Sequence, residues 1–430
     1  MKEYFPSIPA LSYEGSYSSN PFAFKFYDPE RIVAGKPMRE HLRFSLSYEK
    51  AFCVSGADAY GQPTANRHFG AVPAEGTQIA RDRLFALMEL MHKLGLRYFT
   101  MRDRDLAPGA DSLRESGARL DEMAEGLLYL QQVYGVRPMQ FSADLSSHPR
   151  YMNGAATSCS AEVFAFAAAQ VKKALETAHR LGALSFCVSG GREGRAHLLC
   201  VNEALEEENL ARLLQLTADH AAVIGYEGRL CIQPSPPGVV EGPYWGDGRQ
   251  CLDFLRSFRL DAPYQVTLQE HAALPELRAL LRAQKLCSMA TLRAGGGSQG
   301  GLNPVPAAAL ALFELLRHGG FQSGGVLLEA APRRSSNTLE DLCITYMQWM
   351  DAYAVGLMLA QRALLDGRLE QFQRDRYASF GYGVGKAIAE GGADMDALEF
   401  HALQKGEVYA ASARQEYLES MINALLFRNL

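Results

Sequence analysis

Charged side chains that could do chemistry stand directly after several stretches with the pattern of a β-strand. The clearest run is Arg102-Asp103-Arg104-Asp105, and Glu270-His271 and Glu329 stand in the same relation to later stretches. Carboxylates and imidazoles are common general acids and bases in enzymes. If one cavity collects these groups, Asp105, Glu270 and His271 are candidate catalytic residues.

Arg102 adds a fixed positive charge beside these carboxylates. A guanidinium stays protonated near neutral pH, so Arg102 cannot serve as a general base. Arg102 and Asp105 could bind an anionic ligand, or they could form a solvated salt bridge. Arg102 is therefore kept as a site candidate with both interpretations open, while Asp103 and Arg104 could be loop charges.

Neutral polar side chains lie at or just after the ends of three strand-like stretches. They are Ser189, Gln233, Ser235 and Gln269. Hydroxyls and amides both donate and accept hydrogen bonds, so this set could bind an uncharged ligand. The same groups could instead satisfy one another. We predict them as the substrate-binding residues.

Alternating helix and strand patterns must position these residues. Apolar residues at helical spacing predict helices over 76–94 and 161–181, ended by Gly95 and Gly182. Strand patterns lie at 96–100, 139–143, 184–188, 229–233, 265–269, 286–290 and 326–329. Such alternation implies parallel strands, and about eight units close a (β/α)₈ barrel with its active groups at the C-terminal strand ends. An open doubly wound sheet is the alternative, but no Gly-rich phosphate turn follows the first strand.

The chain changes character after Gly367. A capping box at Asn337-Thr338-Leu339-Glu340 predicts a long helix that runs towards Gly367. We therefore expect a barrel domain over 1–367 and a C-terminal helical arm over 368–430. The arm is polar and has little apolar periodicity, so we expect it to pack on another subunit of a homo-oligomer.

Composition narrows the class of protein. The chain has 430 residues, 48% of them hydrophobic, and a net charge of -5, which argues against nucleic acid as a partner. We expect no membrane association, because no signal region or long apolar run is present. Scattered cysteines without Cys-x-x-Cys pairs suggest buried thiols in a reducing cytoplasm rather than a zinc site.

Sequence blocks along nearly the whole chain carry a family resemblance. They are Tyr13-Glu14-Gly15, Ser19-Asn20-Pro21-Phe22, His41-Leu42-Arg43-Phe44, Pro149-Arg150-Tyr151, Gly154-Ala155-Ala156-Thr157, Gly190-Gly191-Arg192-Glu193-Gly194, Arg333-Arg334-Ser335 and Ser412-Ala413-Arg414-Gln415-Glu416. In this order they resemble the xylose isomerase family. The resemblance implies a (β/α)₈ barrel whose C-terminal arm embraces a neighbour in a dimer or tetramer. It also implies interconversion of an aldose and a ketose with two divalent ions, Mg²⁺, Mn²⁺ or Co²⁺.

The residues that the resemblance assigns to chemistry differ in this chain. Arg102 stands where the family has the histidine that assists ring opening, and Ser189 replaces a tryptophan. Gln233 replaces a metal-bridging glutamate, and Ser235 replaces a lysine that contacts the substrate. Glu49-Lys50 replaces a Trp-His pair that shapes the sugar pocket.

The metal ligands are depleted as well. The chain has no acid over 290–306, where the family supplies several ligands, and a glycine run at 295–301 could be a lid or a filler. His271 and Glu329 remain as residual ligand positions, with Glu270 as a partial substitute. A lone histidine can equally be a structural residue. Two or three ligands do not make a two-metal site, so we predict no family-type metal pair.

Three functions remain open at this point. The protein could be a non-catalytic homologue with a structural or regulatory role, possible co-assembly with an active isomerase included. It could be a repurposed enzyme for a sugar-like substrate, or an ordinary xylose isomerase. Because no nucleophile–base pair replaces the lost groups, we favour the non-catalytic homologue. Arg192 and Glu193 are expected to form a structural pair in a tight loop.

Overall fold

Eight parallel strands form a closed barrel in the computed structural model, which describes residues 3–54, 69, 76–195, 197, 199–236, 238–269, 272–291, 305–329, 336, 338–409 and 411–426. Neighbouring strands follow the order β10-β11-β12-β3-β4-β5-β6-β8. Their bounds are β3 Ser45–Ser47, β4 Tyr98–Arg102, β5 Arg137–Ser142, β6 Ser185–Ser189, β8 Arg229–Gln233, β10 Tyr264–Leu268, β11 Leu286–Ala290 and β12 Val326–Leu328. The predicted (β/α)₈ barrel with a C-terminal helical region is confirmed.

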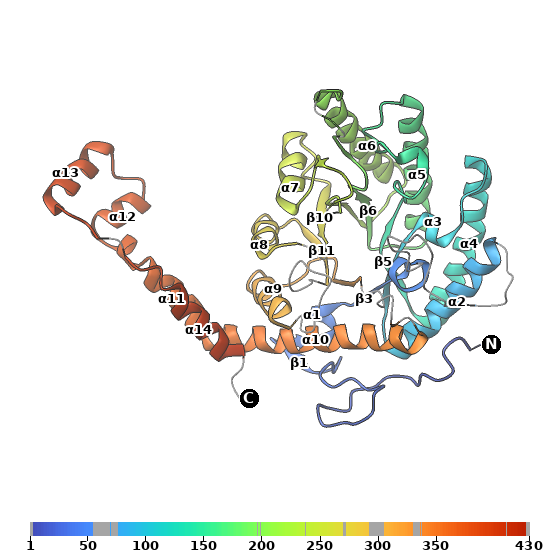
Figure 1. The fold of residues 1–430 in the computed structure, drawn as a ribbon, viewed down its shortest axis with the longest axis horizontal. Coiled ribbons are helices and arrows are strands. Elements are labelled where there is room, and N and C mark those ends of the chain that lie inside the picture. Colours follow the sequence, from blue (N-terminus) through green and yellow to red (C-terminus); the bar gives the residue numbers. More distant parts are fainter. Residues whose placement is uncertain are drawn as a thin grey trace. The chain divides into compact units, whose positions relative to one another are not determined.

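Helices connect the strands and surround them (Figure 1). They are α1 Met38–Leu42, α2 Gly76–Leu94, α3 Asp103–Leu106, α4 Leu113–Tyr134, α5 Ala161–Arg180, α6 Glu203–Val223, α7 Gly248–Ser257, α8 Leu274–Arg282, α9 Val305–Arg317 and α10 Leu339–Asp366. Two short antiparallel pairs also form, β1 Ile32–Val33 with β2 Lys36–Pro37 and β7 Gly194–Arg195 with β9 Gly242–Pro243. Helix α2 shows why they pack, because its apolar stripe, Leu84, Leu87, Met88 and Met91, is buried.

The barrel interior is unusually polar. Barrel interiors are dominated by branched aliphatic side chains, whereas here Ser45, Ser185 and Ser288 are buried, and Cys187, Cys231 and Cys287 form a buried cluster. The Thr267 hydroxyl of β10 donates to Gln140 Oε1 of β5 at 3.1 Å, and these strands are not neighbours. The hydrogen bond between Thr267 and Gln140 therefore links two strands that are not neighbours in the barrel.

The N-terminal segment is held against the barrel by two carboxylates. Glu89 of α2 accepts from the backbone N–H of Tyr4 at 2.6 Å and of Phe5 at 2.9 Å. Asp351 of α10 accepts from the N–H groups of 25–27 at 2.8–2.9 Å. Phe5 is fully buried, so this segment belongs to the core of the barrel unit.

The chain divides into two compact units, Met1–Gly356 and Leu357–Leu430, and the division lies inside α10 rather than at the expected 367/368 position. The second unit contains α11 Arg368–Arg376, α12 Gly383–Ala389, α13 Met395–Lys405 and α14 Gln415–Leu426. Among the helices of the described residues, none has the length and apolar character that a membrane span requires.

Candidate functional site at the barrel mouth

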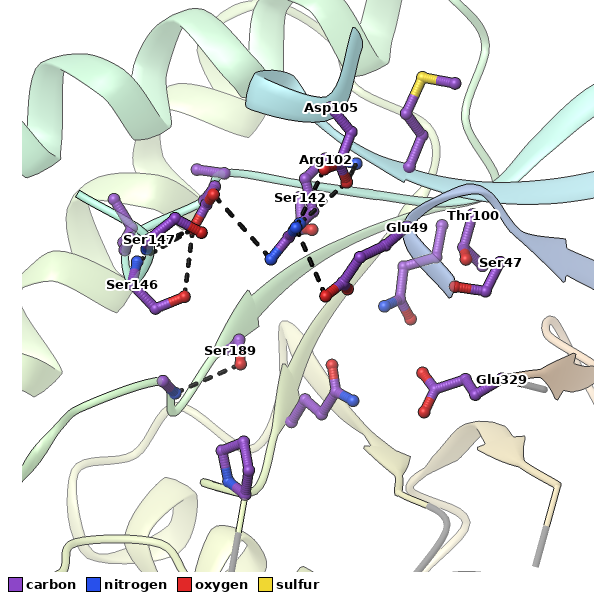
Figure 2. A pocket seen from close by; sticks show the side chains of 18 of the residues that line it. Ser47, Glu49, Thr100, Arg102, Asp105, Ser142, Ser146, Ser147, Ser189 and Glu329 are labelled. Carbon is purple, nitrogen blue, oxygen red and sulfur yellow. Dashed lines mark hydrogen bonds and ion pairs between the residues drawn. The ribbon is translucent and has the colours of Figure 1, made fainter. Parts of the chain in front are cut away.

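A cavity of about 440 Å³ opens where the C-terminal ends of the barrel strands meet. Side chains from several strand ends and the loops that follow them line it (Figure 2). They include Ser47, Glu49, Lys50, Thr100, Arg102, Asp105, Gln140, Ser142, Asp144, Ser146, Ser147, Ser189, Arg192, Gln233, Gln269 and Glu329. The strand-end rule of (β/α)₈ barrels places active groups at this face.

Arg102 is the centre of an ionic cluster in this mouth. Its Nε and Nη2 donate to the two carboxylate oxygens of Asp105, both at 2.9 Å. Glu49 also faces the guanidinium (Figure 2), with its Oε1 3.5 Å from Nη2. Asp144 Oδ2 lies 3.9 Å from Nη1. Burial alone would lower the pKa of Arg102, but these carboxylates raise it above its usual value. The guanidinium therefore carries its charge at every working pH.

Asp144 is held ionised in the same cluster. Its Oδ1 accepts from the N–H and hydroxyl of Ser146, both at 3.1 Å, and from the N–H of Ser147 at 3.0 Å. Burial would raise the pKa of Asp144, but Arg102 and the Ser147 donors outweigh it and lower the pKa below its usual value. The sequence analysis missed this residue, although it follows the expected strand 139–143 directly and the strand-end rule could have found it.

Asp103 is turned away from the mouth. Its carboxylate is buried and accepts from the N–H groups of Arg104 and Asp144 and from Gln170 Nε2, each at 2.8 Å. Burial raises the pKa of Asp103 to about 6, against the effect of these donors. Asp103 thus stabilises the loop that carries Asp144, and it does not line the cavity.

The neutral candidates divide into two groups. Ser189, Gln233 and Gln269 line the cavity. Ser189 Oγ accepts from the N–H of Gly191 at 3.3 Å, and Gln269 Nε2 donates to the carbonyl of Pro234 at 2.6 Å. Each side chain keeps further donors or acceptors for a ligand.

Ser235 lies behind the wall of the cavity instead of lining it. The residue is 2% exposed, and its hydroxyl has no hydrogen-bond partner among the described residues. It packs with Trp245 against Gly190, where a Cβ atom would overlap both Ser235 Oγ and Trp245 Nε1. This close approach explains why glycine stands at 190.

The loop after β6 is fixed by Glu193. Its buried carboxylate accepts from the N–H groups of Ala155, Ala156 and Thr157 at 2.9–3.0 Å and from the Thr157 hydroxyl at 2.6 Å. The expected structural role of Glu193 is therefore met by the backbone of another loop. Arg192 lines the mouth and takes no part in these hydrogen bonds.

Of the three remaining candidates, Glu270, His271 and Glu329, the structure describes only Glu329. Glu270 and His271 lie outside the described residues, as do the glycine run 295–301 and Arg333-Arg334-Ser335. Glu329 follows β12 and lines the cavity, apart from the cluster around Arg102 (Figure 2).

The described mouth residues do not fit a pair of divalent ions. Across the ranges that the structure describes, no group of three His, Cys, Asp or Glu side chains could hold a metal. Hard divalent ions need several oxygen ligands with net negative charge. Here Glu49, Asp105 and Asp144 surround the Arg102 guanidinium, whose charge repels a cation.

Comparison with known proteins finds relatives that match this chain over its full length. It is 39% identical to the xylose isomerase of Thermotoga neapolitana, with 100% of this chain and 99% of the relative covered. The chain belongs to the xylose isomerase family. The xylose isomerase of Caldicellulosiruptor bescii is 38% identical, with 99% of each chain covered.

Two further comparisons concern the arm and the barrel of this xylose isomerase family member. Residues 373–426 match the family model described as the XylA2 C-terminal domain. The crystal structure of D-psicose 3-epimerase from Clostridium cellulolyticum H10 has a TM-score of 0.50 and 12% identity, and the match covers 73% of this chain and 99% of the epimerase. At that identity the likeness concerns the fold alone.

Proposed function

We propose that this chain is a non-catalytic member of the xylose isomerase family with a structural or regulatory role. One observation carries the proposal. At the position where the resemblance expects the ring-opening histidine, Arg102 is engaged by Asp105, Glu49 and Asp144. A permanently charged guanidinium accepts no proton, and its partners are not free to bind a divalent ion.

The loss of isomerase chemistry follows from electrostatics. Stabilisation of developing charge is usually the largest single contribution to catalysis. In the described mouth, Gln233 and Ser189 offer dipoles at positions where the resemblance expects a metal-binding or sugar-packing side chain, and Gln269 adds another neutral amide. Such groups bind a ground-state ligand through hydrogen bonds but supply little charge stabilisation. A small, uncharged, polyhydroxylated ligand suits this surface.

The C-terminal arm is the proposed contact with a partner. Helices α11 and α13 bury no residue within the chain. Large apolar side chains of the arm are exposed, among them Tyr377, Tyr382, Phe400, Leu403 and Tyr409. An apolar surface of this kind is typical of an interface. We propose that it packs on a second copy of this chain, and that the match of 373–426 to a family C-terminal domain also permits co-assembly with an active isomerase.

An isomerase assay tests the proposal. The purified protein is incubated with xylose or glucose and Mg²⁺, Mn²⁺ or Co²⁺, with the Thermotoga neapolitana enzyme as the positive control. We expect no turnover for this chain, while calorimetry detects polyol binding that Gln233→Ala weakens. Turnover at a normal enzymatic rate that His271→Ala abolishes would contradict the proposal.

A further inference from the structure

A second cavity, of about 470 Å³, opens at the other end of the barrel, where β3 and β4 begin. It lies at the N-terminal ends of the strands, away from the mouth. Its walls come from the segment before β1, from α1, and from the residues that lead into β3, β4 and β12. The lining residues are Tyr27, Pro29, Glu30, Arg39, Glu40, Arg43, Phe44, Gly95, Leu96, Arg97, Tyr98 and Phe321.

Three guanidinium groups line this cavity. Arg39 forms an ion pair with Glu30. Arg43 and Arg97 have no carboxylate within ion-pair distance among the described residues, and the Arg43 guanidinium lies 5.5 Å from the centre of the Tyr98 ring. Glu40 is an exposed carboxylate on the rim. Two cations with unused donors therefore face a cavity that is large enough for a small ligand.

Tyr27 contributes a neutral donor to the lining of the same cavity. Its ring is buried and packs edge-on against Phe24 and Phe44, with ring centres 5.2 and 5.3 Å away. Its hydroxyl forms no hydrogen bond with any described residue. Burial raises the pKa of Tyr27, although the nearby charges of Arg39 and Arg97 oppose the rise. The phenol therefore stays protonated and can donate to an anion.

We propose that this cavity binds a phosphate monoester with a planar body, a mononucleotide being the ligand class that fits. The phosphate would receive charged hydrogen bonds from Arg43 and Arg97, because guanidinium forks match phosphate geometry. Tyr98 and Phe321 are partly exposed, and their rings offer apolar surface for a base. The proposal is independent of the function proposed for the mouth, since no mouth residue lines this cavity.

The lining residues are the reason for proposing both the phosphate group and the planar body of the ligand. Inorganic phosphate alone would leave most of a 470 Å³ cavity to water. A neutral nucleoside would leave two arginines without a counter-charge. Residues at the N-terminal face of a (β/α)₈ barrel ordinarily contribute to stability. Stability does not require guanidinium groups without a carboxylate partner on a cavity wall.

Calorimetric titration of the full chain with AMP, adenosine and inorganic phosphate tests the proposal. We expect AMP to bind more tightly than either of the other probes. Arg97→Gln should weaken AMP binding by about tenfold or more, since one charged hydrogen-bond partner is lost. Arg43→Gln should have a similar effect. Arg31→Gln is the matched control, because Arg31 is an exposed arginine of the same region that does not line the cavity.

Thermal melting of each variant shows whether it is folded. Arg97 is exposed, so its variant reports on binding even if Arg43→Gln disturbs the fold. The proposal is overturned if AMP does not bind, if adenosine binds as tightly as AMP, or if Arg97→Gln changes nothing. If inorganic phosphate and AMP bind with equal affinity, the cavity does not recognise the planar body, and the proposal is wrong on that point.

Discussion

Arg102 is the residue on which the charge balance of the barrel mouth depends. The side chains of Asp105 and Asp144 are 6% and 3% exposed, so their charges are poorly screened by water. Glu49 is 37% exposed and contributes less to the cluster. Without the guanidinium, these carboxylates would face one another with no cation between them, a strongly destabilising arrangement for partly buried charges.

We therefore predict that Arg102→Met lowers the free energy of unfolding at pH 7 by about 2–4 kcal/mol. Asp144 now has a lowered pKa, so its stabilising effect is present above the pKa of the unfolded chain and is lost as the pH falls through the folded value. In the variant, burial would raise that pKa instead, so the deficit should shrink towards pH 4. Urea unfolding at both pH values measures this, with Arg212→Met as an exposed control. An equal deficit at pH 7 and pH 4 would show that the loss is not electrostatic.

The sequence predicted the mouth only in part, for a physical reason. Arg102 and Asp105 are three residues apart on one turn, so their pairing is local and could be foreseen. The approach of Glu49 and Asp144 depends on the barrel bringing three strand ends together, which no local pattern encodes. Ser235 has the residue type of a ligand-binding group, but its direction is set by the packing of Trp245 against Gly190.

Among the secondary-structure elements, α10 has a role beyond covering the barrel. Its Asp351 accepts from consecutive backbone N–H groups at 25–27, which have no strand partner of their own. Three hydrogen bonds to one carboxylate fix the path of the N-terminal segment. Tyr27, the last of these three residues, lines the cavity at the N-terminal ends of the strands.

We predict that Asp351→Asn loosens this segment without unfolding the barrel. The amide has one acceptor oxygen and presents an NH₂ group to a backbone donor, so at least one hydrogen bond is lost, at a cost of about 1–3 kcal/mol. Hydrogen exchange at 25–27 should accelerate while exchange in β4 and β5 stays unchanged. Glu340→Gln, an exposed acid in the first turn of the same helix, is the control. Unchanged exchange at 25–27 would show that the carboxylate is not needed.

Most elements were predictable because their apolar periodicity is strong. Helix α2 has the predicted bounds, and β8 and β11 coincide with the predicted strands 229–233 and 286–290. The strand β3 was not predicted, because it has only three residues, Ser45–Ser47, two of which are serines. Its strand character comes from pairing with β4 and β12 and not from its own sequence.

For the whole molecule, the exposed apolar side chains of the arm have a consequence for assembly. Within Leu357–Leu430, Met421 and Leu425 of α14 are buried, while α11 and α13 bury nothing. A helical unit with so little core does not gain enough apolar burial to be stable alone. We expect its order to depend on contacts with another chain.

We predict that the full chain is a dimer or larger assembly at micromolar concentration, and that removing residues 368–430 yields a monomer. Light scattering measures both. If the truncated chain fails to fold, Phe400→Glu with Tyr409→Glu in the full chain tests the same surface, since both side chains are exposed. Glu399→Gln, on the same helix as Phe400, is the control. A full chain that is monomeric, or variants that assemble normally, would reject the arm as the interface.

The closure of the barrel also has a consequence for biosynthesis. The first barrel strand, β3, pairs with the last, β12, through Ser45 with Leu327 and Leu46 with Leu328. At about 5–20 residues per second, translation needs roughly a quarter of a minute to a minute to proceed from β3 to β12. During this time β3 has an unpaired edge, which is a common starting point for aggregation. The short length of β3 and its two serines reduce this risk, because short and polar edge strands are poor templates for pairing with other chains.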